Sequence, residues 1–180
     1  MLMEAGRCAL LLIDLQERLM PAIAGGERIV ARADILLRCA RRLDIPVLAT
    51  RQYPRGLGGL VAPFADSLSE EECRDKTAFS AFAEPGVRSA LRDLGRDQFV
   101  LAGVEAHVCV LQSALDLRAE GYDVAVVADA VASRAAESHA LALERLRRHG
   151  VEVVSVEMVL FEWLQKAGTD AFRELSPLIR

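Results

Sequence analysis

Residues 98 to 129, QFVLAGVEAHVCVLQSALDLRAEGYDVAVVAD, predict a strand, a helix and a second strand in that order. The apolar runs QFVLAG (98–103) and YDVAVVAD (122–129) lack strict alternation, which is typical of strands buried on both faces. The segment between them, about 108–120, has helical periodicity and ends before Gly121. A unit of this kind places its two strands in parallel, joined by a right-handed crossover.

The same alternation extends over most of the chain. Further strands are predicted at 8–13 (CALLLI), 45–50 (IPVLAT) and 151–156 (VEVVSV), and helices at about 27–43, 86–94 and 134–149. This order predicts an α/β fold of three layers, with a central parallel sheet covered by helices on both faces. A length of 180 residues suits a single domain, 1–180. The longest irregular stretch, 51–84, is of a length that usually indicates a functional loop.

Composition narrows the class of partner. The net charge is -4, from 22 basic and 26 acidic residues of interspersed sign, which argues against a nucleic-acid or anionic-membrane surface and favours a small-molecule substrate. The hydrophobic share of 52% is high for a chain with no apolar run of membrane-spanning length, so we expect part of it to lie in a homo-oligomer interface. The start of the chain reads as a buried strand and not as an export signal, which predicts a cytoplasmic protein with four reduced cysteines.

Three chemically distinct residues are expected near the carboxyl ends of the strands, where open parallel sheets bind ligands. Asp14 ends the first strand run, Cys109 follows the run at 98–103, and Lys76 lies near the end of the irregular stretch. Only Lys76 and Lys166 are lysines among the 22 basic residues, so a lysine in this chain is informative. If the strands before Asp14 and Cys109 flank the point where strand order reverses, the three side chains converge.

Each of these residues has two interpretations from the sequence. Cys109, in the first turn of the predicted helix, is either a buried apolar side chain or a nucleophile whose pKa the helix terminus lowers. Its neighbour His107 is two positions away and does not face it on a helix, so a Cys–His pair is poorly supported. Asp14 is either a helix cap or a base for Cys109, and Lys76 is either a solvated loop charge or a cation that stabilises both anions.

With these residues in this order, the sequence resembles the isochorismatase-like cysteine hydrolases, a superfamily that includes nicotinamidases and N-carbamoyl amide hydrolases. The segments that carry the resemblance are LLLIDLQ (10–16), KTAFSAF (76–82) and the long block AGVEAHVCVLQSALDLRAEGYDVAVVADAVASR (102–134). GVEAHVCV together with RQYPRGLGGLV (51–61) looks most like the isochorismatase-domain subgroup, whose substrates are poorly defined.

The resemblance implies a fold and a mechanism. The fold is Rossmann-like, with a parallel sheet of about six strands. Cys109 would attack a carbonyl carbon, Asp14 would carry the thiol proton to the leaving amine, Lys76 would hold both anions, and water would hydrolyse the thioester. The family also implies a cis peptide between Val104 and Glu105, which would direct the backbone N–H of Glu105, with that of Cys109, at the oxyanion.

Two departures from the family limit the substrate. Nicotinamidases carry an Asp-x-His-x-His metal site near the second strand, but ATRQYPRGLGG (49–59) has no histidine, so we predict no metal and doubt nicotinamidase activity. Isochorismatases proper cleave a vinyl ether and generally lack the cysteine. Six residues are candidates for the substrate pocket: Gln16, Arg51, Gln52, Tyr53, Phe79 and Phe82. The alternative for Arg51, Gln52 and Tyr53 is a structural loop packed at a subunit contact, and at least one of the two phenylalanines is expected to pack in the core. Arg51 would suit an anionic substrate.

Two hypotheses for function follow. The leading one is a metal-independent hydrolase that cleaves a C–N bond of a small amide or carbamoyl compound through an Asp14–Lys76–Cys109 triad. The alternative is a non-catalytic binding or scaffold protein on the same fold. We expect no cofactor, because no glycine-rich dinucleotide turn follows the first strand.

Overall fold

The computed structural model describes residues 1–179, which form an α/β fold around one six-stranded parallel sheet. The strands are β1 (Cys8–Ile13), β2 (Val47–Gln52), β3 (Cys73–Lys76), β4 (Gln98–Val104), β5 (Asp123–Ala132) and β6 (Glu152–Val154). Their order across the sheet is β3-β2-β1-β4-β5-β6. The chain therefore adds β2 and β3 on one side of β1, returns to the centre of the sheet, and adds β4, β5 and β6 on the other side of β1. The predicted fold class is confirmed.

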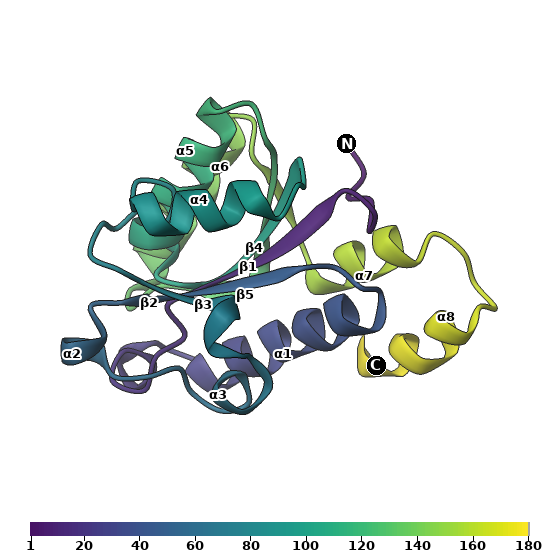
Figure 1. Ribbon diagram of the computed structural model, residues 1–180, viewed down its shortest axis with the longest axis horizontal. Helices are drawn as coiled ribbons and strands as arrows, with labels where there is room; N and C mark the ends of the chain where they lie inside the picture. Colours follow the sequence, from purple (N-terminus) through teal and green to yellow (C-terminus); the bar gives the residue numbers. More distant parts are fainter. Residues whose placement is uncertain (180) are drawn as a thin grey trace.

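Helices cover both faces of the sheet (Figure 1). The α-helices are α1 (Gly26–Arg42), α2 (Pro54–Leu57), α3 (Phe64–Ser67), α4 (Pro85–Asp93), α5 (Leu111–Ala119), α6 (Ala136–Arg148), α7 (Val156–Leu164) and α8 (Asp170–Leu175). Side chains of α1 and α7 pack in one apolar cluster, and those of α4, α5 and α6 in a second cluster on the opposite face. No helix within residues 1–179 is both long and apolar enough to cross a membrane.

The sequence pattern explains why these elements form. All six residues of β1 are buried, as are all seven of β4, which accounts for their continuous apolar runs. In α1 the buried positions recur at three- and four-residue spacing, among them Ile29, Ala33 and Leu36, so one stripe of the helix packs on the sheet. Trp163 of α7 is also buried in this cluster, where it helps to cover the sheet.

Three elements differ from the prediction, and helices α2, α3, α7 and α8 were not predicted. β6 is shorter than the strand predicted at 151–156, because Val156 begins α7. β3 lies inside the stretch predicted to be irregular. The prediction missed this strand because no apolar run marks it: only Cys73 and Lys76 of its four residues are buried. The helix predicted at 108–120 is preceded by a π-helical turn, Ala106–Val110, and the α-helix itself begins at Leu111. Cys109 therefore lies in the π-helical turn and not in the first turn of α5.

Gly103 allows the carboxyl ends of β1 and β4 to come close together. Its φ of 121° is one that L side chains rarely adopt, and a Cβ atom at this position would lie 2.0 Å from the backbone oxygen of Ile13. Ile13 and Gly103 are paired in the sheet. The close approach brings the residue after β1, Asp14, beside the turn that follows β4.

Candidate active site

The candidate site lies where the strand order reverses. β1 and β4 are neighbours at the centre of the sheet, and their carboxyl ends lead into Asp14 and the π-helical turn that holds Cys109. Lys76 ends the edge strand β3, two strands away from β1. Ligands of open parallel sheets bind at such a reversal, outside the carboxyl ends of the strands.

Asp14 and Lys76 form a fully buried ion pair. Lys76 Nζ donates to Asp14 Oδ2 at 2.8 Å, and both side chains are 0% exposed. The second carboxylate oxygen, Oδ1, accepts a hydrogen bond from Thr50 Oγ1 at 2.7 Å. A buried charge is tolerated when it is paired and hydrogen-bonded, and here both carboxylate oxygens have a donor. Asp14 is therefore no helix cap, and Lys76 is no solvated loop charge.

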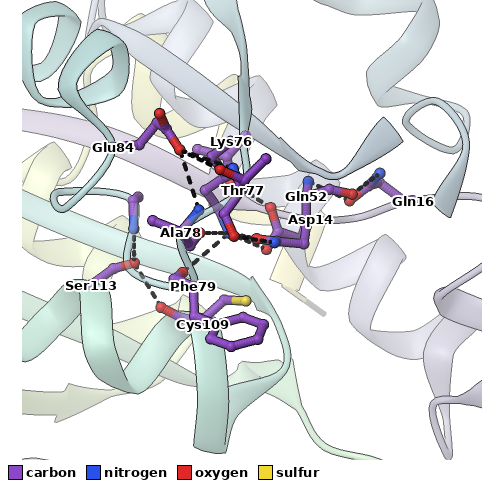
Figure 2. A network of polar contacts seen from close by, with 12 residues as sticks. Asp14, Gln16, Gln52, Lys76, Thr77, Ala78, Phe79, Glu84, Cys109 and Ser113 are labelled. Atoms are coloured by element: carbon purple, nitrogen blue, oxygen red, sulfur yellow. Dashed lines mark hydrogen bonds and ion pairs between the residues drawn. The ribbon is translucent and has the colours of Figure 1, made fainter. Parts of the chain in front are cut away.

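Further oxygens surround the ammonium group of Lys76 (Figure 2). Nζ donates to the side-chain oxygen Oε1 of Gln52 and to the backbone oxygen of Phe79 at 3.1 Å, and the backbone oxygen of Ala78 lies at 3.4 Å. The loop that supplies the two carbonyls is held by Glu84, whose Oε2 accepts the backbone N–H of Thr77 at 2.9 Å. The ammonium position is thus fixed by a strand, a side chain and a loop together.

Gln16 supports the site through the backbone. Its Oε1 accepts the N–H of Gln52 at 2.8 Å, and its Nε2 donates to the carbonyl of Gly58 at 2.8 Å. The side chain is 0% exposed, so it does not line an open pocket. Gln16 instead fixes the end of β2 and the loop beyond it, which corrects its expected place in the pocket lining.

The thiol of Cys109 lies close enough to Asp14 and Lys76 to interact with both side chains. Cys109 is 6% exposed and packs in the cluster that includes Phe82, Ala106 and Val110. Burial, together with the negative charge of Asp14, raises the pKa of the Cys109 thiol to about 12, while Lys76 opposes the increase. Figure 2 shows the sulfur on the side of Cys109 that faces Asp14 and Lys76.

This direction corrects the sequence-based expectation for Cys109. A helix terminus was expected to lower the pKa of the thiol, but the cysteine precedes the α-helix and is buried beside a carboxylate. Desolvation disfavours the thiolate, and the anion of Asp14 adds to that effect. The resting site therefore holds a neutral thiol beside an ion pair.

The peptide bond between Val104 and Glu105 is cis, at the position that the resemblance implies. Among residues 1–179 no backbone oxygen accepts a hydrogen bond from the N–H of Glu105. The carboxylate of Glu105 is held away from this N–H, since its Oε2 accepts from the backbone N–H of Arg134 at 2.9 Å and from Arg134 Nε at 3.1 Å. His107 is also engaged elsewhere, with Nδ1 2.8 Å from Ser133 Oγ.

The remaining candidates for the pocket separate into three groups. A cavity of about 360 Å³ beside β3 is lined by Tyr53, Pro54, Arg55, Asp75, Lys76, Thr77 and Glu84, but not by Cys109. Phe79 is 55% exposed at the loop that surrounds Lys76. Phe82 is 4% exposed and packs edge-on against Tyr122, so it belongs to the core.

Arg51 does not offer its charge to the site. Its Nε bonds Asp75 at 2.6 Å, and both terminal nitrogens bond Glu70 at 3.1 Å. These carboxylates raise the pKa of the Arg51 guanidinium above its ordinary value. The charge is therefore neutralised within the protein, which removes the reason for expecting an anionic substrate from this residue.

Sequence reasoning missed Thr50, which completes the hydrogen bonding of Asp14. Thr50 ends the apolar run IPVLAT and pairs with Ile13 in the β1–β2 register, one residue before Asp14. Aligning the two predicted strands at their carboxyl ends is the signal that points to it.

The sequence matches a known protein family and is similar to several of its members. The model of the isochorismatase domain family matches residues 8–158. The chain is 39% identical over 173 residues to isochorismatase domain-containing protein 2 of Danio rerio, covering 94% of this chain and 85% of that protein. It is also 39% identical over 168 residues to isochorismatase domain-containing protein 1 of the same organism, but spans only 59% of that longer protein.

Solved structures give the same picture. The MAR1 ribonuclease from Caenorhabditis elegans superposes with a TM-score of 0.92 at 33% identity, covering 99% of this chain and 92% of that one. The YcaC gene product of Escherichia coli, described as an octameric hydrolase of unknown specificity, superposes with a TM-score of 0.88 at 22% identity, covering 98% and 90%. At 22% identity, the likeness to the YcaC gene product shows a shared fold and nothing more.

Proposed function

The chain belongs to the isochorismatase domain family, and on that premise we propose that it is a metal-independent cysteine hydrolase that cleaves the C–N bond of a small amide or carbamoyl compound. The observation that carries the proposal is the buried Asp14–Lys76 ion pair facing the thiol of Cys109. These are the nucleophile, the proton carrier and the cation that a thioester mechanism requires.

In the proposed first step the sulfur of Cys109 bonds to the carbonyl carbon while the thiol proton passes to Asp14. Because burial and the carboxylate raise the pKa of the thiol to about 12, little thiolate exists before the substrate arrives, and we infer that the proton leaves as the S–C bond forms. Lys76 remains beside both groups and balances the negative charge that moves from the carboxylate to the substrate oxygen.

In the following steps Asp14 returns the proton to the leaving nitrogen, and the C–N bond breaks. Water then attacks the thioester carbon and releases the acid and the free thiol. We assign the developing oxyanion to the backbone N–H groups of Glu105 and Cys109. Backbone donors of this kind stabilise tetrahedral intermediates strongly, since they are fixed before the reaction.

A substrate screen with paired variants tests the proposal. Wild type, Cys109→Ala and Asp14→Asn are incubated with a panel of amides and carbamoyl compounds, and released ammonia or amine is measured. Because loss of the nucleophile or its proton acceptor removes the covalent route, we expect each variant to lose at least about 10³-fold in kcat. Cys39→Ala, a buried thiol in α1, is the control that keeps activity. Hydrolysis that survives Cys109→Ala would contradict the mechanism.

A second candidate function comes from the solved structures. The relative from Caenorhabditis elegans is named a ribonuclease, which raises RNA as a substrate. The net charge of -4 offers no general attraction for a polyanion, so we retain the small-molecule assignment. Labelled RNA belongs in the same screen: cleavage that disappears in Cys109→Ala would favour this candidate, and binding of a partner without any turnover would favour the scaffold alternative.

We also propose that the protein is a homo-oligomer and acts in the cytoplasm. Support for assembly comes from large apolar side chains that remain exposed on the single chain, among them Tyr53, Phe79, Leu141, Met158 and Phe161. One relative, 35% identical over 156 residues, is named a secreted isochorismatase effector from Phytophthora sojae, and this name counts against a cytoplasmic location.

A further inference from the structure

One buried hydroxyl group joins the two segments that carry Lys76 and Cys109. Ser113 lies in α5 and is 0% exposed. Its Oγ donates to the backbone oxygen of Cys109 at 2.6 Å and accepts the backbone N–H of Ala81 at 2.8 Å (Figure 2). The donor and acceptor capacities of this hydroxyl are thus both used, one toward each segment.

The segment that contains Ala81 is the loop that surrounds the ammonium group. Lys76 Nζ donates to the backbone oxygen of Phe79, two residues before Ala81. The other segment is the π-helical turn that holds the sulfur of Cys109. A shift of either segment relative to Ser113 changes the distance between the sulfur and the ammonium.

Formation of α5 does not by itself favour a serine at this position. Serine is a poorer helix former than alanine, and a hydroxyl that bonds the carbonyl four residues earlier slightly destabilises a helix. Ser113 makes that bond to Cys109 and adds a second one to a different segment, 32 residues away in the chain. The cross-link between segments is therefore the feature that sets this serine apart from a helix-forming residue.

We propose that Ser113 is a positioning residue, which holds the turn of Cys109 and the loop of Lys76 at the separation that the reaction requires. The inference rests on the proposed function and deepens it, since it assigns a role in the same site to a residue that touches neither the substrate nor the ion pair. The electrostatic influence of Lys76 and Asp14 on the thiol depends on their distance from it, so this separation sets how readily Cys109 reacts.

The test compares three variants by kinetics. Ser113→Ala removes both hydrogen bonds, Ser113→Thr retains the hydroxyl, and Ser80→Ala is the matched control. Ser80 is 4% exposed in the same loop, and its Oγ accepts the N–H of Ala83 at 3.3 Å. Within residues 1–179 it makes no hydrogen bond to the turn of Cys109. Misplacement of reacting groups acts on the chemical step, so we expect Ser113→Ala to lower kcat by about 10- to 100-fold with KM within about 3-fold.

The two other variants show whether the effect depends on the hydroxyl group of Ser113. We expect Ser113→Thr to return kcat to within about 3-fold of wild type, and Ser80→Ala to keep it within about 2-fold. Thermal melting of each variant identifies any loss of fold. A Ser113→Ala protein that melts lower but keeps the wild-type kcat per folded molecule would show a structural role only, and would overturn the inference.

A second readout does not depend on any substrate. The rate at which iodoacetamide alkylates Cys109 is followed by mass spectrometry, with Cys39 of the same molecule as the internal reference. We expect Ser113→Ala to change the Cys109 rate at least about 3-fold relative to Cys39, and Ser80→Ala to leave it unchanged. If wild type hydrolyses no amide, the proposed function fails while this comparison still decides the role of Ser113.

If Ser113→Ala does not fold, Ser113→Cys replaces it in the kinetic comparison. A thiol is a weaker donor and acceptor than a hydroxyl, so we expect a folded protein with kcat lowered at least about 3-fold. A wild-type kcat in this variant would overturn the inference.

Discussion

At the scale of single residues, the site combines a neutral thiol with a charged pair. Cys109 has its pKa raised to about 12 by burial and by the charge of Asp14, whereas Lys76 acts in the opposite direction. Both carboxylate oxygens of Asp14 have donors, from Thr50 and Lys76. The carboxylate therefore suppresses thiolate in the resting protein. In the mechanism that we propose, it becomes the proton acceptor only when a carbonyl carbon is available to the sulfur.

This balance predicts an unusual pH dependence for Cys109 alkylation. Because only the thiolate reacts and its pKa lies near 12, the rate in wild type should rise about tenfold per pH unit from pH 7.5 to 10, with no plateau near the ordinary thiol pKa. In Asp14→Asn the carboxylate charge is gone and Lys76 remains, so the thiol pKa falls. Alkylation at pH 8 should then increase about tenfold, although hydrolysis is lost.

Iodoacetamide kinetics followed by mass spectrometry measure both effects. Cys39 is the control in the same chain, since burial alone raises its pKa to about 12 and no carboxylate is among the causes. An Asp14→Asn protein whose Cys109 reacts more slowly than in wild type would show that the carboxylate does not suppress the thiolate.

The residue types of the site were predictable, but their environment was not. Asp14 and Cys109 follow apolar strand runs that the sequence marks clearly, and Lys76 is one of two lysines. The pKa of Cys109 depends on burial and on the position of Asp14, 95 residues earlier in the chain, which no local pattern contains. Arg51 lies opposite Asp75 because of the β2–β3 register, so its neutralisation required the pairing of a strand that was not predicted.

At the scale of elements, the strands with continuous apolar runs were predicted and the edge strand β3 was not. β1 and β4 are buried along their whole length, so composition alone identifies them. β3 has the sequence Cys-Arg-Asp-Lys, in which hydrogen bonding to β2 and not hydrophobicity defines the strand. The π-helical turn before α5 was missed for a similar reason, since its periodicity differs little from that of the helix that follows.

The close approach of β1 and β4 gives a prediction at this scale. Gly103→Ala would place a Cβ atom 2.0 Å from the backbone oxygen of Ile13, at a φ of 121°, so one of the two central strands must move. We expect the free energy of unfolding to fall by about 3 kcal/mol or more, from overpacking and backbone strain together. Chemical denaturation measures the change.

Gly95→Ala is the matched control for backbone strain without close packing. Gly95 also has a positive φ, 63°, but a Cβ atom there meets nothing within 4 Å. We expect a loss of only about 1 to 2 kcal/mol. Equal losses in the two variants would show that the approach of β1 to β4 is not the tight contact described above.

At the scale of the whole molecule, the reversal of strand order explains how distant parts of the chain meet. β1 stands between β2 and β4, so residues from the first, second and fourth strands reach one edge of the sheet, and β3 adds Lys76 from the outside. The alternation of strands and helices predicts this architecture, and the resemblance to isochorismatase-like hydrolases adds the strand number. The sequence pattern does not contain the arrangement of the side chains between residues 53 and 84 that line the cavity beside β3.

Assembly belongs to this scale as well. Met158 and Phe161 are 48% and 43% exposed on neighbouring turns of α7, and Leu141 is 59% exposed on α6. Apolar groups of this size are typically covered when a protein forms oligomers. We expect light scattering to give a mass that is a multiple of the 19.6 kDa chain, and a monomeric mass at micromolar concentration would contradict the proposal.

Lys76 lies on the edge strand β3, but it neutralises a carboxylate that is buried at the centre of the sheet, that of Asp14. Separation of β3 from β2 would move the ammonium group of Lys76 into water. The carboxylate of Asp14 would then remain buried without its counter-ion. Separation of β3 from β2 therefore costs more free energy than the loss of four residues of strand pairing alone. The ion pair between Lys76 and Asp14 thus stabilises the attachment of β3 to the sheet.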